Sequence, residues 1–397
     1  MPDLIPFGFA RFCSQHEFDG SAGQFERIFE ITDESQTVTK HRITTPKKDL
    51  VILPSSNEDK IANHRQFEIV NAGKQIDPVF LLSQRAGWNQ TSADLNALVA
   101  QTHSLNLLAV YHMNGQMAPL GSGLVVDSEA TVAWISMLLV HPELRSQGIG
   151  MSLLKECMVT ARLQLGKQVI GLDATPMGQP LYERMGFRPS FRIWRSLLST
   201  PDDTKVLEYT VESLREVMDC GSLLRATKAE QKLASLTNLH KIYHAGSWVV
   251  KSKGDILGLV LSRPGRKHPF IGPLLALEPG IAACLLSHAL QFWRRQGAAE
   301  CFLDIPENHF ATASVWDNGQ CTGLPERFEL TSSVRPVRIL TRMYEHTSST
   351  PLTLIPNNIS KQYQAQLEAS SSATRDHIQA EKSVLPYLFS GAGPEFG

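Results

Sequence analysis

The apolar positions between residues 65 and 200 change from the spacing of strands to that of helices and back. Short apolar-rich runs at 67–70, 107–113 and 120–126 predict strands, and residues 78–84 predict a short helix. Residues 133–140 are almost continuously apolar, which is typical of a strand buried on both faces. Apolar residues then recur at three- and four-residue steps as far as Leu165, which predicts a helix ending at Gly166. A strand at 169–175, a helix at 178–185 and a strand at 191–197 complete a mixed α/β (α+β) domain over 65–200.

The rest of the chain divides into segments of different texture. A gap-free shift of 131 residues predicts that 241–345 repeats the earlier plan. The identities that carry this prediction include Pro142 with Pro273, Leu154 with Leu285, and Asp173 with Asp304. Residues 1–64 are expected to form an irregular arm and 201–240 a helical linker. Residues 346–397, rich in Ser, Thr, Asn and Gln, are expected to form a mobile tail.

Composition narrows the class of protein. A length of 397 residues predicts two or three domains, and 42% hydrophobic residues are enough for real cores. Lys and Arg total 38 against 39 Asp and Glu, so the formal charge of −1 argues against a dedicated nucleic-acid binder. The six cysteines lack metal-type spacing and are expected to be reduced thiols, with no metal site. Since no secretory signal or membrane span is recognisable, a cytoplasmic protein is expected.

One segment has a pattern that indicates chemistry. A buried strand ends at Val140, a short loop follows, and Gly148 and Gly150 begin a long helix. The first turn of a helix leaves backbone N–H groups unpaired and carries partial positive charge. Glycines keep Cβ atoms away from these amides, so the corner can hold a phosphate, with Arg145 placed to pair with a pyrophosphate.

Three interpretations of this corner compete. A dinucleotide site of the G-x-G-x-x-G type lacks its third glycine, because Leu153 stands there. A Walker loop requires Gly-Lys-Ser/Thr, which is absent. An ordinary strand–helix turn is the plainest alternative, and the wider context argues against it.

That context resembles a known family. The run Arg145-x-x-Gly148-x-Gly150 after Val140-His-Pro resembles the acetyl-coenzyme A pyrophosphate loop of the GNAT superfamily of N-acetyltransferases. Residues 172–176 (Leu-Asp-Ala-Thr-Pro) and 180–187 (Pro-Leu-Tyr-Glu-Arg-Met-Gly-Phe) are similar to that superfamily's next strand and tyrosine-bearing helix. Residues 86–91 (Ala-Gly-Trp-Asn-Gln-Thr) resemble a two-domain, YitH-like branch. Residues 240–345 look like that branch's C-terminal domain, through residues 262–265, 271–273 and 303–306.

The resemblance implies a GNAT-like mixed central sheet flanked by helices, followed by a second, degenerate GNAT-like domain. It also implies how acetyl-coenzyme A is bound. Its pyrophosphate would lie on the loop formed by Arg145, Ser146, Gln147, Gly148, Ile149 and Gly150. Its pantetheine arm would pair with the backbone of Leu138, Leu139 and Val140, and an amide near Leu139 or Val140 could hold the thioester oxygen. Tyr182 occupies the position of the acid that protonates the departing thiolate.

Several residues have a structural alternative beside the functional one. Tyr182 could instead be a packing residue, and His141 is either a base or a loop histidine. Ser136, Asp127, Glu129 and Asp173 are further polar candidates that the sequence does not rank. Trp88, Asn89 and Thr91 line the acceptor side in one reading, while Thr91 or Ser92 caps a helix in the other. Aromatic residues in this region are expected in the core; these are Trp134, Phe187, Phe191 and Trp194.

The second half departs from the motif. Under the 131-residue shift, Arg145, Gly148 and Gly150 become Ala276, Pro279 and Ile281. Because proline lacks an N–H group and the arginine is lost, no tight coenzyme binding is expected there. This half is predicted to have a structural or substrate-shaping role, and its basic cluster at 263–268 is expected to be a solvated turn.

The leading hypothesis is an acetyl-coenzyme A-dependent N-acetyltransferase. It would act on a small-molecule or peptide amine by direct attack in a ternary complex, with no metal, nucleic acid or membrane as partner. The alternative is a catalytically weak or inactive acyl-coenzyme A-binding sensor or scaffold. A hydroxyl acceptor or a longer acyl donor also stays open, as does the oligomeric state.

Overall fold

The computed structural model describes residues 67–397, with gaps at 101–102, 114–115, 128–129, 200–208, 310–315, 318–319, 322–333, 347–349, 351–354, 356–359, 386–387 and 391–397. Of the first 66 residues it describes the backbone of β1 (His16–Glu17), β2 (Gln24–Thr32) and β3 (Val38–Pro46), which form an antiparallel sheet. This corrects the expectation of a wholly irregular arm. Aromatic and β-branched residues are frequent in Gln24–Thr32 and favour a strand.

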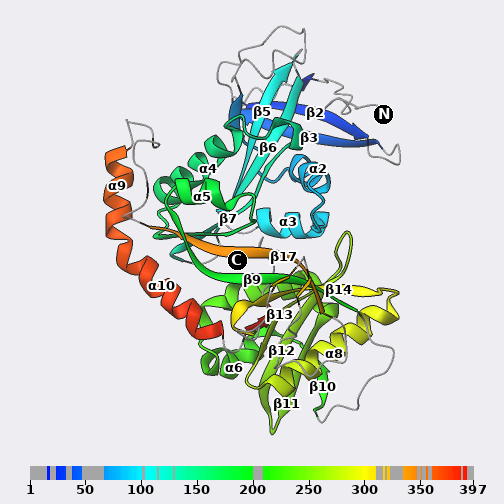
Figure 1. Ribbon diagram of the computed structural model, residues 1–397. Helices are drawn as coiled ribbons and strands as arrows, with labels where there is room; N and C mark the ends of the chain where they lie inside the picture. The colour runs from blue at the N-terminus through cyan, green and yellow to red at the C-terminus, as the bar shows by residue number, and fades with distance from the viewer. Residues whose placement is uncertain are drawn as a thin grey trace.

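The first half is a mixed sheet with helices on both faces (Figure 1). Its strands are β4 (Glu68–Asn71), β5 (Leu105–Met113), β6 (Gln116–Asp127), β7 (Val132–Val140) and β8 (Val169–Ala174). Strands β4 to β7 are antiparallel neighbours, and β8 joins β7 in parallel. Helices α2 (Asp77–Arg85) and α3 (Ser92–Ala100) pack on one face. Helices α4 (Ile149–Val159) and α5 (Gln179–Arg184) lie on the other.

Alternate side chains of the central strands feed the two hydrophobic layers. Leu108, Leu124 and Trp134 face α2 and α3, while Ala109, Val125 and Ile135 face α4. Strand β7 is therefore buried on both sides, as its continuous apolar run predicted. The predicted elements of 67–197 are present within a few residues, but α3 was not predicted.

The second half has a similar plan. It contains the strands β10 (Val211–Ser213), β11 (Ser247–Ser252), β12 (Asp255–Arg263), β13 (Phe270–Ala276) and β14 (Glu300–Pro306), and the helices α6 (Gly221–Ala226), α7 (Leu233–Tyr243) and α8 (Pro279–Arg295). Strand β13 pairs with β14 in parallel at a single position, Phe270 with Phe302. A short hairpin is formed by β15 (Trp316–Asp317) and β16 (Gln320–Cys321).

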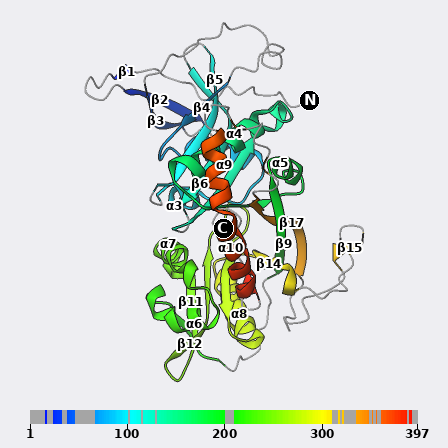
Figure 2. The ribbon, with the colours of Figure 1, turned by 90° about the vertical axis from the view of Figure 1, so that its left-hand side faces the viewer.

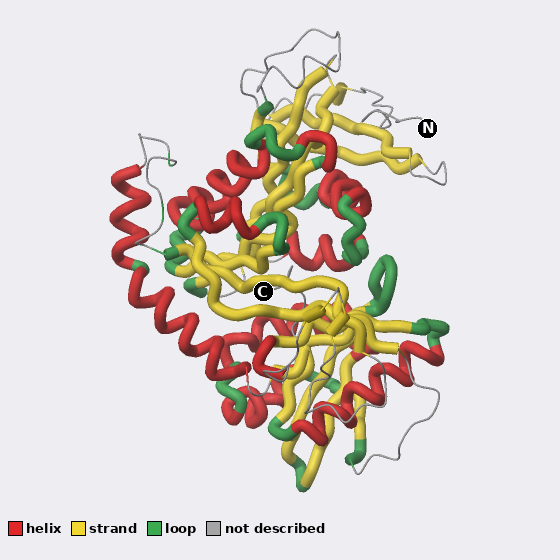
Figure 3. The backbone as a smooth tube through the Cα atoms, viewed as in Figure 1, coloured by secondary structure: helices red, strands yellow, loops and turns green. Residues whose placement is uncertain are grey.

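The two halves exchange strands. Strand β9 (Phe187–Ser199), the last of the first half, pairs with β14 of the second half from Ile193 to Ser199. Strand β17 (Val334–Glu345), the corresponding strand of the second half, lies between β9 and β8. Within the described residues one sheet therefore runs through both halves, in the order β10-β11-β12-β13-β14-β9-β17-β8-β7-β6-β5-β4 (Figure 3). The predicted boundaries at 200 and 345 do not separate two independent sheets.

The C-terminal segment forms a helical strap instead of the expected mobile tail. Helices α9 (Ser360–Ala369) and α10 (Ser371–Val384) run along one side of the molecule from the first half to the second (Figures 1 and 2). Tyr363 and Leu367 are buried, and the Tyr363 hydroxyl donates to Glu345, which pairs with the buried Arg162. The prediction of a mobile tail failed because these helices are mostly polar. They bury only a few side chains, too few to give a clear helical pattern of apolar residues in the sequence.

A buried ion-pair cluster joins this strap to the central strands. Arg342 on β17 donates to both carboxylate oxygens of Asp173 on β8, at 2.9 and 2.8 Å, and also pairs with Glu381 on α10. The Arg342 guanidinium lies 4.5 Å from the centroid of the Trp134 ring, and Tyr344 donates its hydroxyl hydrogen to Glu381. Such a cluster is stable only when each buried charge is paired, which is the case here.

Acid sensitivity should depend on Glu381. Burial alone would raise the pKa of this carboxyl, but Arg342 and Lys232 lower it from 4.5 to about 2. A lowered pKa contributes stability that is complete above pH 4.5 and is lost as the pH falls toward 2. The contribution is on the order of 3 kcal/mol. We expect Glu381→Gln to lower the unfolding free energy at pH 7 by most of this amount and at pH 3 by much less. Denaturant unfolding at the two pH values measures it, and an equal loss at both would contradict the expectation.

Candidate functional site

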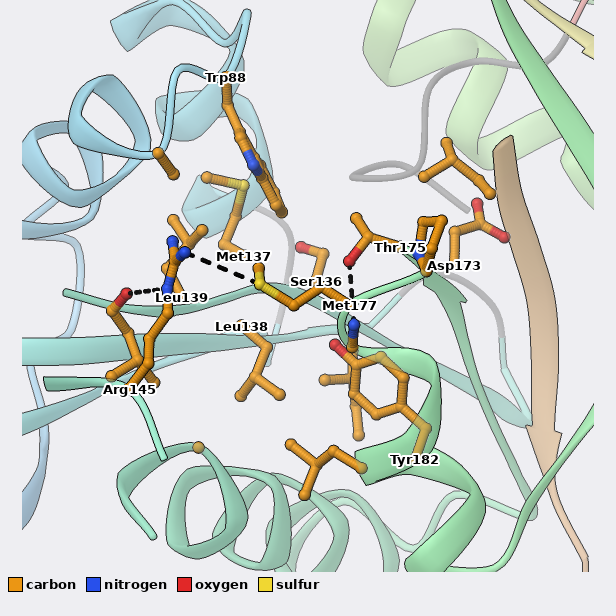
Figure 4. A pocket seen from close by; sticks show the side chains of 18 of the residues that line it. Trp88, Ser136, Met137, Leu138, Leu139, Arg145, Asp173, Thr175, Met177 and Tyr182 are labelled. Carbon is orange, nitrogen blue, oxygen red and sulfur yellow. Dashed lines mark hydrogen bonds between the residues drawn. The ribbon is translucent and has the colours of Figure 1, made fainter. Parts of the chain in front are cut away.

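Strands β7 and β8 separate part-way along their length. Their pairing covers Val132 with Val169 through Trp134 with Gly171 and ends there, after which β8 continues beside β17. A bulge in β7 marks the separation: Met137 has a φ of +49°, and the Ser122 hydroxyl donates to its carbonyl at 2.8 Å. Residues 135–140 are therefore left with an edge that β8 does not cover, and this edge lines a cavity of about 920 Å³ (Figure 4).

The direction of the edge amides follows from the pairing with β6. The His141 amide donates to the Leu120 carbonyl at 2.9 Å, so it points toward β6. Because amides alternate in direction along a strand, the Val140 amide points the other way, into the gap between β7 and β8. Of the two amides expected near the thioester, that of Val140 thus lies on the uncovered edge, and that of Leu139 faces β6.

The loop after β7 leads into helix α4. A single 3₁₀ turn at Pro142–Leu144 is followed by Gly148, the N-cap of α4, with a φ of +86°. A Cβ atom at Gly148 would meet nothing within 4 Å, so this position opens into space. No side chain caps the helix, and Gly148, Gly150 and Met151 at its start line the cavity. The first amides of a helix have no partner within the helix. The conformation requires a glycine-like residue, and the open space is suited to an anion.

Arg145 stands beside this cradle. Its Nε lies 3.4 Å from the Val140 carbonyl oxygen and its Nη1 lies 3.7 Å from the Met177 sulfur, while the side chain is exposed (Figure 4). No ion pair between Arg145 and another described residue occupies the guanidinium. It is available to a ligand at the mouth of the cavity.

Most residues predicted to hold the coenzyme lie together. The cavity is lined by Leu138, Leu139, Val140, Arg145, Ser146, Gly148 and Gly150. Ile149 instead buries its side chain in the core, where it packs against Gly121, and Gln147 does not line the cavity. A Cβ at Gly150 would make only ordinary contacts at 3.5 Å with Leu181 and Val140, so Gly148 is the more constrained of the two glycines.

Tyr182 reaches the cavity from α5. Its ring is 8% exposed, packs edge-on against Phe187 at 6.2 Å, and extends toward the gap between β7 and β8 (Figure 4). Burial raises the pKa of the phenol well above 10, so the hydroxyl keeps its proton at any physiological pH. Tyr182 is therefore a packing residue that also lines the cavity, so both alternatives are compatible with its position.

The other polar candidates separate by location. Ser136 and Asp173 line the cavity. Asp127 does not line it, and its carboxylate accepts from Lys167 at 2.5 Å. Glu129 lies outside the described residues. His141 is buried outside the cavity lining, 3.4 Å from Arg85, and burial lowers its pKa to about 4. Its geometry fits a structural loop histidine.

The motif at residues 86–91 joins the two halves. Asn89 donates to the His268 carbonyl at 2.9 Å and accepts from the Lys267 amide at 2.9 Å, and the Arg266 side chain donates to the Trp88 carbonyl. Thr91 forms a capping box with Asp94 at the start of α3, so the capping alternative holds for Thr91. Trp88 alone of these three residues lines the cavity.

The basic cluster at 263–268 is also not a free turn. Arg263 is 3% exposed and pairs with Asp94 at 3.0 Å, and Asp94 in turn accepts from the Tyr243 hydroxyl. The sequence predicted a solvated turn because the partners of this cluster, Asp94 and Asn89, lie about 170 residues earlier in the chain.

Two strands that were not predicted to contribute to the site supply arginines to the cavity wall. Arg195 of β9 and Arg338 of β17 line it, together with Val337, Ile339 and Leu340. They reach it through the strand exchange, which places β17 next to the end of β8. Periodicity within one segment carries no signal of such a pairing.

The second half has no equivalent of the glycine loop. Gly121 of β6 pairs with Val140 of β7, and Gly258 of β12 pairs with Ala276 of β13. Val140 and Ala276 therefore occupy corresponding positions, which are 136 residues apart in the sequence. Ile149 and Leu153 pack on Gly121 as Ile281 and Leu285 pack on Gly258, an offset of 132 for the helix. The gap-free shift of 131 was therefore wrong in detail, because the loop before α8 has lost four residues.

The edge of β13 is also covered. Strand β18 (Leu388–Ser390) pairs with Leu274 and Leu275, the positions that correspond to Leu138 and Leu139 under the strand offset. His309 contacts the carbonyl oxygens of Leu385 and Leu388 at 3.0 and 2.9 Å and holds this segment. The chain's own C-terminal strand thus fills the second half's counterpart of the first-half cavity edge.

The fold and the splayed-strand corner define a family. An acetyltransferase (GNAT) domain model matches residues 105–189, and a second model of the same description matches residues 230–330. The chain belongs to the GNAT acetyltransferase superfamily as a member with two GNAT domains, and it is an acyltransferase by family. The predicted fold class and two-domain organisation are confirmed. The YitH-like branch stays a prediction.

Solved structures agree in fold. An acetyltransferase candidate from Pyrococcus horikoshii is similar at 20% identity with a TM-score of 0.51, over 71% of this chain and 89% of that one. A tandem GNAT protein from the clavulanic acid biosynthesis pathway is similar at 12% identity with a TM-score of 0.50, over 70% of this chain and 98% of that one. At these identities the likeness concerns the fold. No curated protein sequence matches the chain.

Membrane-spanning helices and metal-binding clusters are both absent from the described residues. None of their helices combines the length and apolar character needed to cross a bilayer. Within the same residues, no group of three or more His, Cys, Asp or Glu side chains is arranged to hold a metal ion.

Proposed function

We propose that the protein is an N-acetyltransferase that uses acetyl-coenzyme A and transfers the acetyl group to an amine by direct attack in a ternary complex. The observation that carries this proposal is the uncovered edge of β7 running into the uncapped, glycine-opened start of α4. An open Gly148 corner, an uncommitted Arg145 and the Val140 amide form a continuous wall that fits a pyrophosphate followed by an extended amide-bearing arm.

Different residues along this wall would bind different parts of the coenzyme. Arg145, Ser146, Gly148 and Gly150 hold the pyrophosphate, and the backbone of Leu138 to Val140 pairs with the arm. The Val140 amide faces the gap where the thioester oxygen gains charge, so it supplies a fixed hydrogen-bond donor. Tyr182, whose hydroxyl stays protonated because burial raises its pKa, donates a proton to the departing thiolate.

The amine must be neutral when it attacks, since an ammonium group has no free electron pair. Asp173 is the carboxylate of the cavity lining, but both of its oxygens accept from Arg342. It is thus a poor proton acceptor in this arrangement, and proton loss through water in the open cavity is the simpler route.

The test is calorimetric titration with acetyl-coenzyme A together with detection of free thiol across an amine panel. Micromolar binding and thiol release that requires an amine are expected. Failure to bind would reject the proposal. Binding without thiol release from any amine would favour the alternative of an acyl-coenzyme A-binding sensor.

One acetyl-coenzyme A should bind per chain. The second half lacks the loop, and β18 covers the edge that would pair with a pantetheine arm. Calorimetry at saturating ligand should therefore give a stoichiometry near one. Two equivalents of similar affinity would contradict the assignment of all coenzyme binding to the first half.

A further inference from the structure

Positive side chains outnumber negative ones among the charged residues that line the cavity. The charged residues are Arg145, Asp173, Arg184, Arg195 and Arg338. Asp173, the acidic member of this lining, is already held by Arg342 at 2.9 and 2.8 Å. A polycationic acceptor would therefore find no uncommitted carboxylate among the described lining residues, and the surplus charge of the wall is positive.

Part of this surplus lies in one row across three strands. Arg338 on β17 stands opposite Arg195 on β9, and Arg195 stands opposite Asp304 on β14. The Asp304 carboxylate is occupied by Arg195, whose Nε and Nη2 donate to it at 2.8 and 2.7 Å. The row has two guanidinium groups and one carboxylate.

Arg338 is the group left over. Its guanidinium forms no ion pair or hydrogen bond with any residue that the structure describes, although the side chain is half-buried. Burial and the neighbouring Arg195 lower its pKa, and Asp304 offsets only part of this effect. Like charges facing each other across strands are unfavourable, and an anion at this point would relieve the repulsion.

A second polar group points to a ligand in the same cavity. The Ser136 hydroxyl is buried without a hydrogen-bond partner, its residue is only 6% exposed, and it lines the cavity beside the β7 bulge. Trp88 forms part of the same wall (Figure 4). A buried hydroxyl normally has a partner, so its partner is expected to be the molecule that enters the cavity.

We infer that the acceptor is an amine that also carries an anionic group, a carboxylate or a phosphate, and that Arg338 binds this group. The inference rests on the proposed function and names its substrate class. Arginine suits the task because its planar fork can donate two parallel hydrogen bonds to either anion. The reactive amine would then lie toward Tyr182, with Ser136 lining the same cavity.

Matched pairs of amines test this class directly. One arm compares lysine with 1,5-diaminopentane and phenylalanine with 2-phenylethylamine, which differ by one carboxylate. The other compares glucosamine 6-phosphate with glucosamine. With thiol release as the readout, at least one anionic member should exceed its partner in kcat/KM by roughly 10- to 100-fold. The arm that responds identifies the anion as carboxylate or phosphate.

Variants assign the preference to one side chain. Arg338→Gln should reduce the ratio of kcat/KM between the members of the responding pair by roughly 10-fold or more, mainly through KM of the anionic member. Arg338→Lys, which keeps charge but loses the fork, should give an intermediate ratio. Arg335→Gln is the matched control, because Arg335 lies on the same strand but is exposed and pairs with Glu300 at 3.3 Å.

Two results with wild-type protein would overturn the inference: equal use of both members of every pair, or a preference for the amines without an anionic group. A preference that survives Arg338→Gln would also overturn it. Acetyl-coenzyme A binding with no thiol release from any amine would also overturn it. Calorimetry keeps the two proposals apart, because coenzyme binding fails only if the assignment of the β7–α4 corner is wrong.

Discussion

Replacing Gly148 by valine should weaken acetyl-coenzyme A binding by at least roughly 100-fold, because it removes charge-assisted hydrogen bonds to the pyrophosphate. Two effects act together. The residue has a φ of +86°, which a β-branched side chain rarely adopts, and its Cβ would enter the open space at the start of α4. Calorimetric titration of wild type and variant measures the loss.

The chain contains a matched control for this substitution. Gly297 has the same φ of +86° and equally open surroundings, but it follows α8 and does not line the cavity. Gly297→Val should therefore cost similar stability, about 1–2 kcal/mol, and leave coenzyme affinity unchanged. Equal weakening by both variants would mean that backbone strain, and not access to the amides, explains the effect.

Replacing Tyr182 by phenylalanine should lower kcat by roughly 100- to 1,000-fold with little change in acetyl-coenzyme A affinity. The ring contact with Phe187 is kept, and only the hydroxyl is lost. Steady-state kinetics with a reactive amine, together with calorimetry, separates the two quantities. An unchanged kcat would leave Tyr182 as a packing residue.

The pH dependence gives a second measure of the same role. Burial raises the pKa of Tyr182 above its ordinary value of 10.0, so the acid form persists further into the alkaline range than that of a free tyrosine. We expect no loss of kcat up to pH 10 from ionisation of this group. An alkaline decline near pH 8 that disappears in Tyr182→Phe would contradict the raised pKa of this phenol, although not its role as the acid.

Local patterns in the sequence were enough to predict most elements of the first half, with α3 as an exception. The continuous apolar run of β7, the helical spacing after Pro142 and the two glycines are signals within one segment, and each corresponds to an observed element. The same signals brought together seven of the nine residues predicted to bind the coenzyme.

The parts that were not predicted depend on contacts between distant segments. Arg195 and Arg338 reach the cavity only because β9 and β17 pair with each other and with strands of opposite halves. Glu381 is buried because it pairs with Arg342, and Tyr363 is buried because its hydroxyl donates to Glu345. A polar side chain in a polar tail gives no indication of such a partner.

The interleaving of β9 and β17 means that neither half is a self-sufficient folding unit. A fragment ending at 199 would present β8 with no neighbour where β17 belongs and would carry β9 without β14, leaving two unsatisfied strand edges. Two copies of such a fragment could satisfy each other by trading their last strands. The arrangement resembles a reciprocally swapped dimer joined into one polypeptide, in which the first half carries the open Gly148 corner and the second half contributes β17 to the cavity wall.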